Sequence, residues 1–338
     1  DGGSFPSRVG GVDVKNPVWL APLAGITTPS VRLFFKSMGA GLTHTEMISC
    51  AGLAHGSRKT FSMLRMIEGE GPLVLQLFAP DEVTLFEGAR RALSRSSFDA
   101  ISINMACPMP KVTKKGAGSS LLERPETSAA MVRALTPLGL PVWAKTRKPP
   151  PASSMDTLSF SGMLLEAGAS HVCIHGRTPA QKYGGRADRD AVVRSAKAFP
   201  GMIAASGDIF SVDDTLGLFG EGCSAVFVAR GALKDPFLIP ATLHRCGFPV
   251  DERLLAPELD TRLDLITSLG ERMLQEEGEK TAVVLLKRLL SGMFKGFSGA
   301  SRFRKALFET TDWRGMSEAF EECRSSERGE LCDRREVS

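Results

Sequence analysis

The sequence predicts an α/β fold, a (β/α)8 TIM barrel followed by a smaller all-helical domain. Three observations predict it: eight short apolar runs recur at steady intervals, stretches with helical spacing separate them, and no such run occurs after Leu243. Each run is bounded by Gly, Pro or polar residues, as buried parallel strands are. A doubly wound open sheet has the same alternation, but the count of eight favours the barrel.

The eight apolar runs give the expected strands in order. They are residues 18–21, 42–45, 73–78, 100–104, 142–145, 171–175, 202–206 and 225–229. Between the later runs, apolar residues at helical spacing predict helices around residues 132–138, 158–165 and 192–199. Gly139 and Gly168 stand where two of these helices are expected to stop.

The last quarter of the chain has a different pattern. From Leu259 onward the apolar residues keep helical spacing, with one stripe at Leu263 and Ile266 and another at Val283 and Leu286. Residues 321–338 are dense in charge, and we expect this tail to be frayed. The sequence therefore predicts a barrel domain at residues 1–246 and a helical domain at residues 247–338.

Composition excludes several classes of protein. The chain has 338 residues, 43% hydrophobic and 24% charged, which excludes disordered and fibrous proteins. Seven cysteines without CxxC or Cys/His spacing predict reduced thiols and no metal site. No apolar run approaches the roughly 18 residues of a membrane span, so we expect a cytoplasmic protein without a membrane partner. A net charge of +4 implies no bulk attraction for nucleic acid, although a local basic patch remains possible.

Polar side chains gather where the expected strands end. The active site of a barrel is built at the carboxyl ends of its strands. Taken singly, a buried Cys is usually a small hydrophobic residue and His175 fits a satisfied core histidine equally well. Their joint occurrence at one rim favours a site. The residues concerned are Gln76, Asn104, Cys107, Lys145, His175, Arg177, Ser206, Asp208 and Arg230.

The loops after the seventh and eighth strands predict a phosphorylated ligand. TIM barrels often bind phosphate there through backbone N–H groups. Gly207 and Gly231 permit close approach of the backbone, and Arg230 supplies charge. On the fourth strand's loop, Cys107 precedes Pro108, and its thiol is a candidate nucleophile, metal ligand or proton donor.

Together these motifs resemble those of the dihydrouridine synthase family, which are flavin-dependent tRNA reductases. The stretch 21–27 resembles the motif that lies against the flavin, and 103–122 resembles the stretch with the catalytic cysteine. Residues 145–147, 175–188 and 287–304 are also of the family type. Several long motifs in the right order make the resemblance specific.

The resemblance implies a mechanism. NADPH reduces FMN, the flavin N5 gives a hydride to C6 of uracil, and Cys107 protonates C5 as a general acid to yield 5,6-dihydrouridine. It also implies that Asn104 holds the uracil edge and that Arg177 is a second uracil contact. The residues expected to line the flavin or hold its phosphate are Pro22, Leu23, Ala24, Gln76, Lys145, His175, Ser206, Gly207, Asp208, Ala229 and Arg230.

A basic stretch in the helical domain predicts an RNA-binding face. Residues 281–305 contain six basic residues and no acidic one, and such a face can bind phosphates, although a solvated helix face has the same composition. The expected partner is tRNA or rRNA, whose target uridine must leave its stack, and we expect the protein to be a monomer. The basic residues are Lys287, Arg288, Lys295, Arg302, Arg304 and Lys305.

The sequence departs from the family pattern at a few positions. Leu23 stands where a methionine is common, Ser206 replaces Asn or Gly, and Ala229 replaces Gly before the arginine. In the helical domain Arg288 stands where a histidine is usual, and residues 292–293 where an aromatic pair is usual.

Two other functions are compatible with parts of the sequence. An FMN barrel acting on a small molecule, such as dihydroorotate or an enone, accounts for the polar residues at the strand ends. It gives no role to the basic helical domain. A non-catalytic RNA-binding or folding-helper protein is disfavoured because Asn104, Cys107, Lys145 and His175 are all present.

Overall fold

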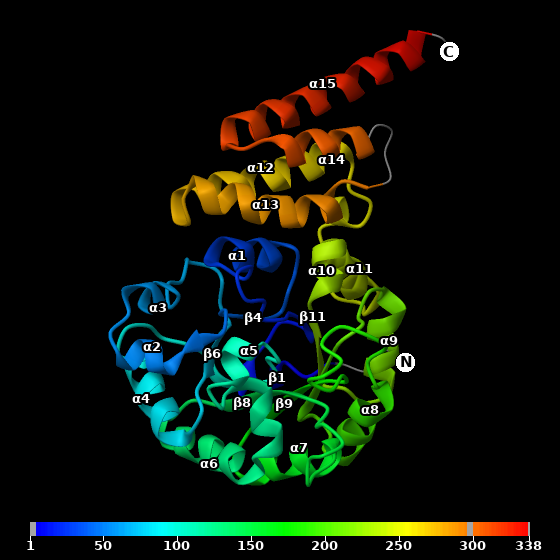
Figure 1. Ribbon diagram of the computed structural model, residues 1–338. Coiled ribbons are helices and arrows are strands. Elements are labelled where there is room, and N and C mark those ends of the chain that lie inside the picture. The colour runs from blue at the N-terminus through cyan, green and yellow to red at the C-terminus, as the bar shows by residue number, and fades with distance from the viewer. Residues whose placement is uncertain (1–4, 296–299, 337–338) are drawn as a thin grey trace.

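The computed structural model describes residues 5–295 and 300–336. The fold is a parallel barrel with a helical domain packed beside it (Figure 1). Residues 296–299 of the family-like stretch in the helical domain lie outside the described residues. The predicted division between residues 246 and 247 falls between the last barrel helix and the helical domain and stays a prediction.

Eight parallel strands form the barrel, and its closure confirms the predicted fold class. Neighbouring strands pair in the order β3-β11-β10-β9-β8-β7-β6-β4. Two backbone hydrogen bonds join the ends of this path, from Leu20 N to Leu42 O at 3.1 Å and from Gly41 N to Val18 O at 2.9 Å. The strands are β3 (Val18–Leu20), β4 (Thr43–His44), β6 (Leu73–Phe78), β7 (Ala100–Met105), β8 (Val142–Arg147), β9 (His171–His175), β10 (Ile203–Ser206) and β11 (Ala225–Val228).

Three further strands are not predicted by the sequence: β1 (Arg8–Val9), β2 (Val12–Asp13) and β5 (Ile48–Ser49). Each consists of one apolar and one polar residue and is not part of an apolar run, unlike β4, which lies within the run at residues 42–45. β1 and β2 form a hairpin. The hairpin packs against the amino-terminal end of the barrel, where the carbonyl of Gly10 accepts a hydrogen bond from Trp143 Nε1 at 2.7 Å.

Helices surround the barrel, and several begin at a side-chain cap. Asp81, Asp156 and Asp188 each accept a backbone N–H from the first turn of the following helix, and Ser211 forms a capping box with Asp214. The helices are α1 (Pro29–Ser37), α2 (Cys50–Ala54), α3 (Arg58–Ser62), α4 (Glu82–Leu93), α5 (Pro110–Thr113), α6 (Pro125–Leu135), α7 (Thr157–Glu166), α8 (Arg189–Ala198), α9 (Val212–Gly220), α10 (Arg230–Lys234) and α11 (Leu238–Arg245), with 3-10 turns at Gly118–Glu123, Thr136–Leu138 and Glu252–Leu254.

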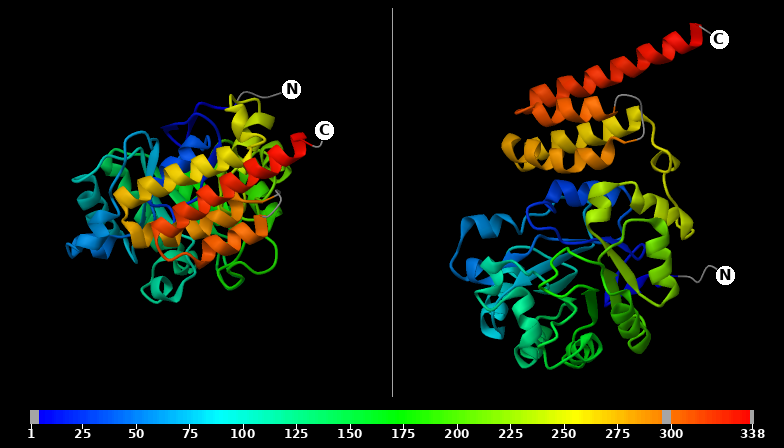
Figure 2. Two further views of the ribbon diagram at one scale, coloured as in Figure 1. Left: turned by 90° about the horizontal axis from the view of Figure 1, so that it is seen from above. Right: turned by 45° about the vertical axis from the view of Figure 1, so that its right-hand side comes forward.

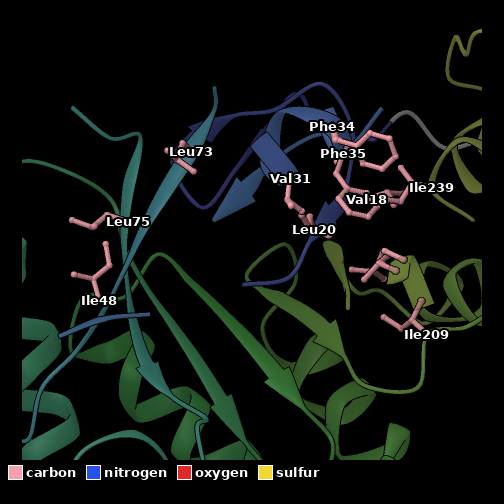
Figure 3. Close-up of a cluster of buried hydrophobic side chains, with 14 of the residues drawn as sticks. Val18, Leu20, Val31, Phe34, Phe35, Ile48, Leu73, Leu75, Ile209 and Ile239 are labelled. Carbon is pink, nitrogen blue, oxygen red and sulfur yellow. The ribbon is translucent and has the colours of Figure 1, made fainter. Parts of the chain in front are cut away.

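The main core lies between the strands and these helices. Figure 3 shows part of it, where Val18 and Leu20 of β3 meet Phe35 of α1 and Ile239 of α11. Burial of these side chains fixes the first helix and the last barrel helix on the same strand.

A second buried cluster, rich in aromatic side chains, fills the interior of the barrel. Trp19 and Trp143 stack with ring centroids 5.4 Å apart, and both contact His171. His44 and His171 are fully buried. Burial lowers the pKa of each imidazole to about 3, so both are neutral in the folded protein.

The helical domain consists of α12 (Leu259–Glu276), α13 (Glu279–Met293), α14 (Ala300–Glu309) and α15 (Trp313–Glu336). The helices lie against the side of the barrel, where α12 packs on α1 and α13 packs on α10, and α15 is farthest from the barrel (Figures 1 and 2). The tail that we expected to be frayed is helical as far as Glu336.

Gly292 lets α13 approach the barrel closely. A Cβ atom added there would clash with the backbone carbonyl of Leu233 and lie 2.9 Å from the carbonyl carbon of Lys234, at the end of α10. A backbone cannot yield as a flexible side chain does. This contact gives a physical reason for glycine at a position where the family that the sequence resembles usually has a larger residue.

We therefore predict that Gly292→Ala destabilises the protein. Alanine is the better helix former by about 1 kcal/mol, but overpacking against backbone costs about 1–3 kcal/mol. Chemical denaturation should show a net loss of unfolding free energy. Gly217→Ala in α9 is the matched control, because nothing lies within 4 Å of its added Cβ, and it should be neutral or stabilising. Equal effects of the two substitutions would contradict the packing argument.

The buried histidines predict a pH dependence of stability. Because the folded-state pKa of His171 is below its ordinary value of 6.5, the unfolded chain binds a proton that the folded chain excludes. The contribution is complete above pH 6.5 and is lost as the pH falls toward 3. At pH 5.5 each such histidine lowers the unfolding free energy by about 1.4 kcal/mol.

Urea denaturation at pH 7.5 and pH 5.5 tests this for His171. The loss of stability between the two pH values should be about 1.4 kcal/mol smaller in His171→Gln than in the unsubstituted protein. The same loss in both proteins would show that His171 takes up its proton without unfolding.

Candidate active site

A cavity of about 580 Å³ lies at the carboxyl ends of the barrel strands. Every residue that the sequence analysis assigned to catalysis, uracil binding or flavin binding lines this cavity, except Arg177. Closure of the barrel brings these residues together from seven loops or strand ends. They are Pro22, Leu23, Ala24, Gln76, Asn104, Cys107, Lys145, His175, Ser206, Gly207, Asp208, Ala229 and Arg230.

The cavity also has lining residues to which sequence reasoning assigned no role. Arg147 and Tyr183 lie within family-like stretches, so a signal for them existed. Met47 and Phe210 follow the second and seventh strands without a distinctive motif, and only the folded chain identifies them. The remaining ones are Ala21, Ile26, Ala106, Pro108, Met109, Lys182, Ile209 and Phe227, whereas Gly231 also lines the cavity and belongs to the expected phosphate loops.

The backbone of Cys107 is held on both sides. Its N–H donates to Asn104 Oδ1 at 2.9 Å, and its carbonyl accepts from Ser119 N at 3.0 Å. Gly118 has a φ of +62°, and an added Cβ would lie 2.6 Å from the Cys107 carbonyl oxygen. The loop therefore depends on glycine at position 118, and it fixes the thiol at the cavity.

Asn104 supports this loop with most of its hydrogen-bonding capacity. Besides Cys107 N, its Oδ1 accepts from Ala106 N at 3.1 Å, and its Nδ2 donates to Gln76 Oε1 at 3.0 Å. The amide oxygen thus caps the turn that follows β7. The second hydrogen on Nδ2 donates to Met47 Sδ at 3.9 Å, a weak acceptor that a ligand oxygen can displace. Asn104 therefore positions Cys107 in addition to its expected role at the uracil edge.

Arg147 joins the Cys107 loop to the loop after β9. Its Nε donates to Ala106 O at 2.8 Å, and its Nη1 donates to Lys182 O at 2.9 Å. The side chain is buried at 3% exposure. This arginine therefore ties the two loops that flank the cavity.

Two buried donors that line the cavity lack partners. Gln76 Nε2 has no hydrogen-bond partner, and no carboxylate lies within ion-pair distance of Lys145 among the described residues. Burial lowers the pKa of Lys145, and the charge of Arg147 lowers it further. Such donors predict a bound group with acceptor atoms at this wall.

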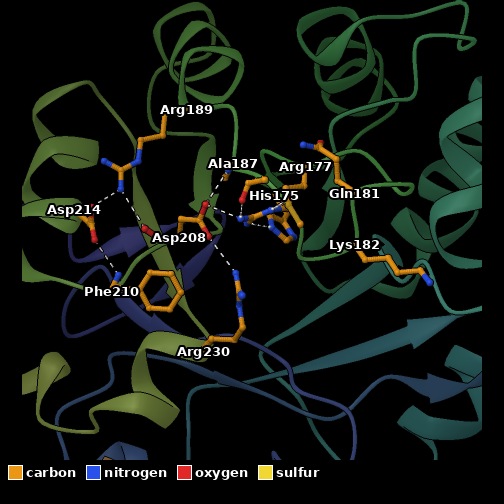
Figure 4. Close-up of polar contacts among 12 residues, drawn as sticks. His175, Arg177, Gln181, Lys182, Ala187, Arg189, Asp208, Phe210, Asp214 and Arg230 are labelled. Carbon is orange, nitrogen blue, oxygen red and sulfur yellow. Dashed lines mark hydrogen bonds and ion pairs between the residues drawn. The ribbon is translucent and has the colours of Figure 1, made fainter.

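Asp208 organises the opposite wall of the cavity (Figure 4). Its Oδ2 accepts from Arg177 Nη2 at 2.7 Å and from Ala187 N at 2.8 Å, and its Oδ1 accepts from Arg230 Nη2 at 3.1 Å. Burial opposes ionisation of Asp208, but the hydrogen bonds outweigh it and lower the pKa. The φ of +51° at Asp208 is held by these contacts.

Arg177 lies behind this wall and not on the cavity surface. It is 2% exposed, and its guanidinium also donates to the carbonyls of Gly184 and Gly185 and lies 3.4 Å from His175 Nε2. In this position Arg177 supports Asp208 and His175, and its expected contact with uracil stays a prediction. The sequence could not reveal this, because its acceptors come from the folded loops.

His175 is a neutral side chain in a positively charged environment. Burial, together with Lys145, Arg147, Arg177 and Arg230, lowers its pKa to about 2. A neutral imidazole has one donor and one acceptor nitrogen. His175 can therefore hydrogen-bond a bound ligand without adding charge.

In the loops expected to bind phosphate, a glycine stands where two backbone segments approach most closely. A Cβ added at Gly231 would clash with the Ile209 carbonyl, so this position requires glycine. Ala229 has a φ of −117°, which does not require glycine, and this explains how the chain tolerates the extra Cβ. The Arg230 guanidinium carbon lies 4.8 Å from the ring centre of Tyr183, a side chain that is 61% exposed at the mouth.

The expected RNA-binding residues divide into two groups. Three of them donate to carbonyls at helix ends: Lys287 to Phe308 and Thr310, Lys295 to Lys234, and Arg304 to Phe294. These contacts satisfy acceptors that have no partner within their own helix. Arg288, Arg302 and Lys305 form the second group and are exposed, as Lys295 also is, and Arg288 donates to the barrel carbonyl of Gly25.

The described residues hold neither a metal-binding cluster nor a membrane-spanning helix. No group of three or more His, Cys, Asp or Glu side chains there could hold a metal ion. No helix in this part of the chain combines the length and apolar character needed to cross a membrane.

Comparisons with solved structures match the fold. Morphinone reductase in complex with tetrahydroNAD superposes with a TM-score of 0.53 at 12% identity, covering 75% of this chain and 93% of that one. TcOYE with pHBA gives 0.54 at 11% identity, covering 75% and 94%. At this identity the likeness concerns the fold alone.

Comparisons with sequences identify the family. The "Probable tRNA-dihydrouridine synthase 1" of Synechocystis sp. is 30% identical over 307 residues, which cover 90% of this chain and 85% of that protein. The "tRNA-dihydrouridine synthase B" of Vibrio cholerae is 30% identical over 315 residues, covering 90% and 95%. The family model for dihydrouridine synthase (Dus) matches residues 19–327, from the first barrel strand into the last helix, and the chain therefore belongs to the dihydrouridine synthase family.

Proposed function

We propose that this protein is an FMN-dependent tRNA-dihydrouridine synthase that uses NADPH to reduce uridines of tRNA to 5,6-dihydrouridine. One observation carries the proposal: a single cavity is lined by Cys107 and by the family-type residues of the other strand ends. The names of the relatives support tRNA as the substrate. We further propose that the protein acts as a cytoplasmic monomer.

The residues present fit a flavin mononucleotide. The unpartnered Gln76 Nε2 and the unpaired Lys145 offer donors to the polar edge of a flat ring. On the opposite wall, beside Asp208, Arg230 and Gly231 suit a phosphate. The phosphate can also accept hydrogen bonds from the first N–H groups of α10. When bound, FMN supplies the hydride that uridine reduction requires.

The charge of the cavity supports an anionic ligand. Lys145, Arg147, Lys182 and Arg230 line it, and Asp208 is the only carboxylate among the lining residues in the described part of the chain. Asp208 pairs with both Arg177 and Arg230, so one positive charge is left over and a phosphate placed beside Arg230 balances it.

Cys107 is the proton donor in this proposal. Its Sγ would hold the proton that uracil C5 receives, as a general acid. Asn104, Ser119 and Gly118 hold the backbone on either side of the thiol, so little reorganisation is needed when a base enters. The exposed Tyr183 at the mouth suits a pyrimidine that has left its stack.

We propose that tRNA docks on the helical domain and the cavity rim. The exposed Arg302 and Lys305 supply charge on α14 without contacting the barrel among the described residues. Phosphate contacts of this kind orient a nucleic acid without reading its sequence.

We predict that Cys107→Ala retains bound FMN and lowers dihydrouridine formation at least about 100-fold, because a positioned general acid contributes about that much. Mass spectrometry of tRNA incubated with enzyme and NADPH measures the product, and absorption spectra report the flavin. Cys246→Ala, which removes a thiol outside the cavity lining, is the control and should keep full activity. Normal turnover by Cys107→Ala would sink the general-acid assignment.

A second prediction concerns the RNA face. Reversing Arg302 and Lys305 to Glu should weaken tRNA binding about tenfold or more at moderate salt and leave NADPH oxidation intact, because these charges are expected to act on phosphates alone. Arg304 is left in place because it caps the end of α13. Filter binding and stopped-flow absorbance measure the two effects.

The control reverses Arg133 and Lys197, which are exposed on the barrel helices α6 and α8. Equal loss of tRNA affinity in both double variants would show that the effect reflects net charge and not a docking face.

A further inference from the structure

The loop between β3 and α1 forms one wall of the cavity and is rigid within itself. Leu23, Ala24 and Ile26 line the cavity. The carbonyl of Leu23 accepts hydrogen bonds from Ile26 N and Thr27 N, both at 3.0 Å, and the hydroxyl of Thr27 bonds back to Leu23 at 3.2 Å. Residues 23–28, here called the cavity loop, therefore move as a unit.

Two charged side chains hold the cavity loop at Gly25. The Gly25 N–H donates to the Glu46 carboxylate, and its carbonyl accepts from Arg288 Nη1 at 3.2 Å. Glu46 follows β4 in the barrel, whereas Arg288 belongs to α13 in the helical domain. Gly25 has a φ of +69°, so the peptide is turned to face these two groups.

The helical domain also holds the other end of this segment. Glu277, which follows α12, accepts from Ser30 Oγ at 2.7 Å and from Ser30 N at 3.2 Å, in the first turn of α1. The carboxylate is 8% exposed and lies at the positive end of that helix. The position of the cavity loop thus depends on contacts from the helical domain at Gly25, within the loop, and at Ser30, just beyond it.

Arg288 differs from Glu277 because its side chain is exposed to solvent. A guanidinium has five N–H donors in a planar fork, and one of them serves Gly25. The fork can hold a phosphate oxygen and a carbonyl at the same time, which a single ammonium does less well. Together with Arg302 and Lys305, Arg288 also belongs to the exposed basic residues of the helical domain.

We propose that Arg288 is a positioning residue that couples RNA binding to the flavin site. An RNA phosphate on the outer donors of Arg288 fixes the guanidinium, and the guanidinium fixes Gly25 and with it the cavity loop. This inference rests on the proposed function and adds a direction: bound tRNA tightens FMN binding. By linkage, FMN tightens tRNA binding by the same factor.

The test measures FMN dissociation constants with and without saturating unmodified tRNA transcript, using the recovery of free FMN fluorescence. Direct binding of FMN alone and of tRNA alone is measured first in the full chain. In the unsubstituted protein, tRNA should tighten FMN binding about fivefold or more, the lower end of typical coupling between sites. In Arg288→Gln the ratio of the two constants should fall to one.

Two further variants separate coupling from charge. Arg288→Lys keeps the charge but should lose most of the coupling. Arg302→Gln removes an equivalent exposed charge on α14, and it should weaken tRNA binding while keeping the coupling at saturation. A ratio of one in the unsubstituted protein, or an unchanged ratio in Arg288→Gln, overturns the inference while the proposed function stands. Failure to bind FMN or tRNA at all overturns both.

Discussion

Closure of the parallel barrel is the constraint on which the rest of the structure depends. The hydrogen bonds between Val18, Leu20 and the segment before β4 complete the ring, so all eight strands point their carboxyl ends to one rim. A doubly wound sheet of the same strands would separate the first loop from the last. Closure places residues 22–24 beside residues 229–231 in one cavity, although about 200 residues of chain lie between them.

Within that cavity, the charged side chains also hold the loops in place. Asp208 pairs with Arg177 and Arg230, and Arg147 ties the loops after β7 and β9, so the cations that surround the ligand site also hold its walls. Neutral His175 adds hydrogen bonds without charge. The arrangement favours a ligand with a polar ring and a phosphate, and it keeps the thiol of Cys107 in a defined place.

The helical domain contributes more than a basic surface. Lys287, Lys295 and Arg304 satisfy the carbonyls at helix ends, and Gly292 permits close contact between α13 and α10. Glu277 and Arg288 reach the barrel beside the cavity loop. These contacts make the relative position of the two regions part of the geometry of the site, which is why binding at one can affect the other.

The sequence by itself determined the eight strands, the fold class and the residues assigned to catalysis and flavin binding, which make up about half of the cavity lining. These depend on short apolar runs and on residues adjacent to strand ends, which are local signals. Only the tertiary structure decided which groups meet. Arg177 turned out to support Asp208, 31 positions away, and Lys287 caps a helix 21 positions on, because hydrogen-bond partners are chosen by the packed backbone and not by composition. The short strands β1, β2 and β5 escaped prediction for the same reason, since their pairing partners in space define them.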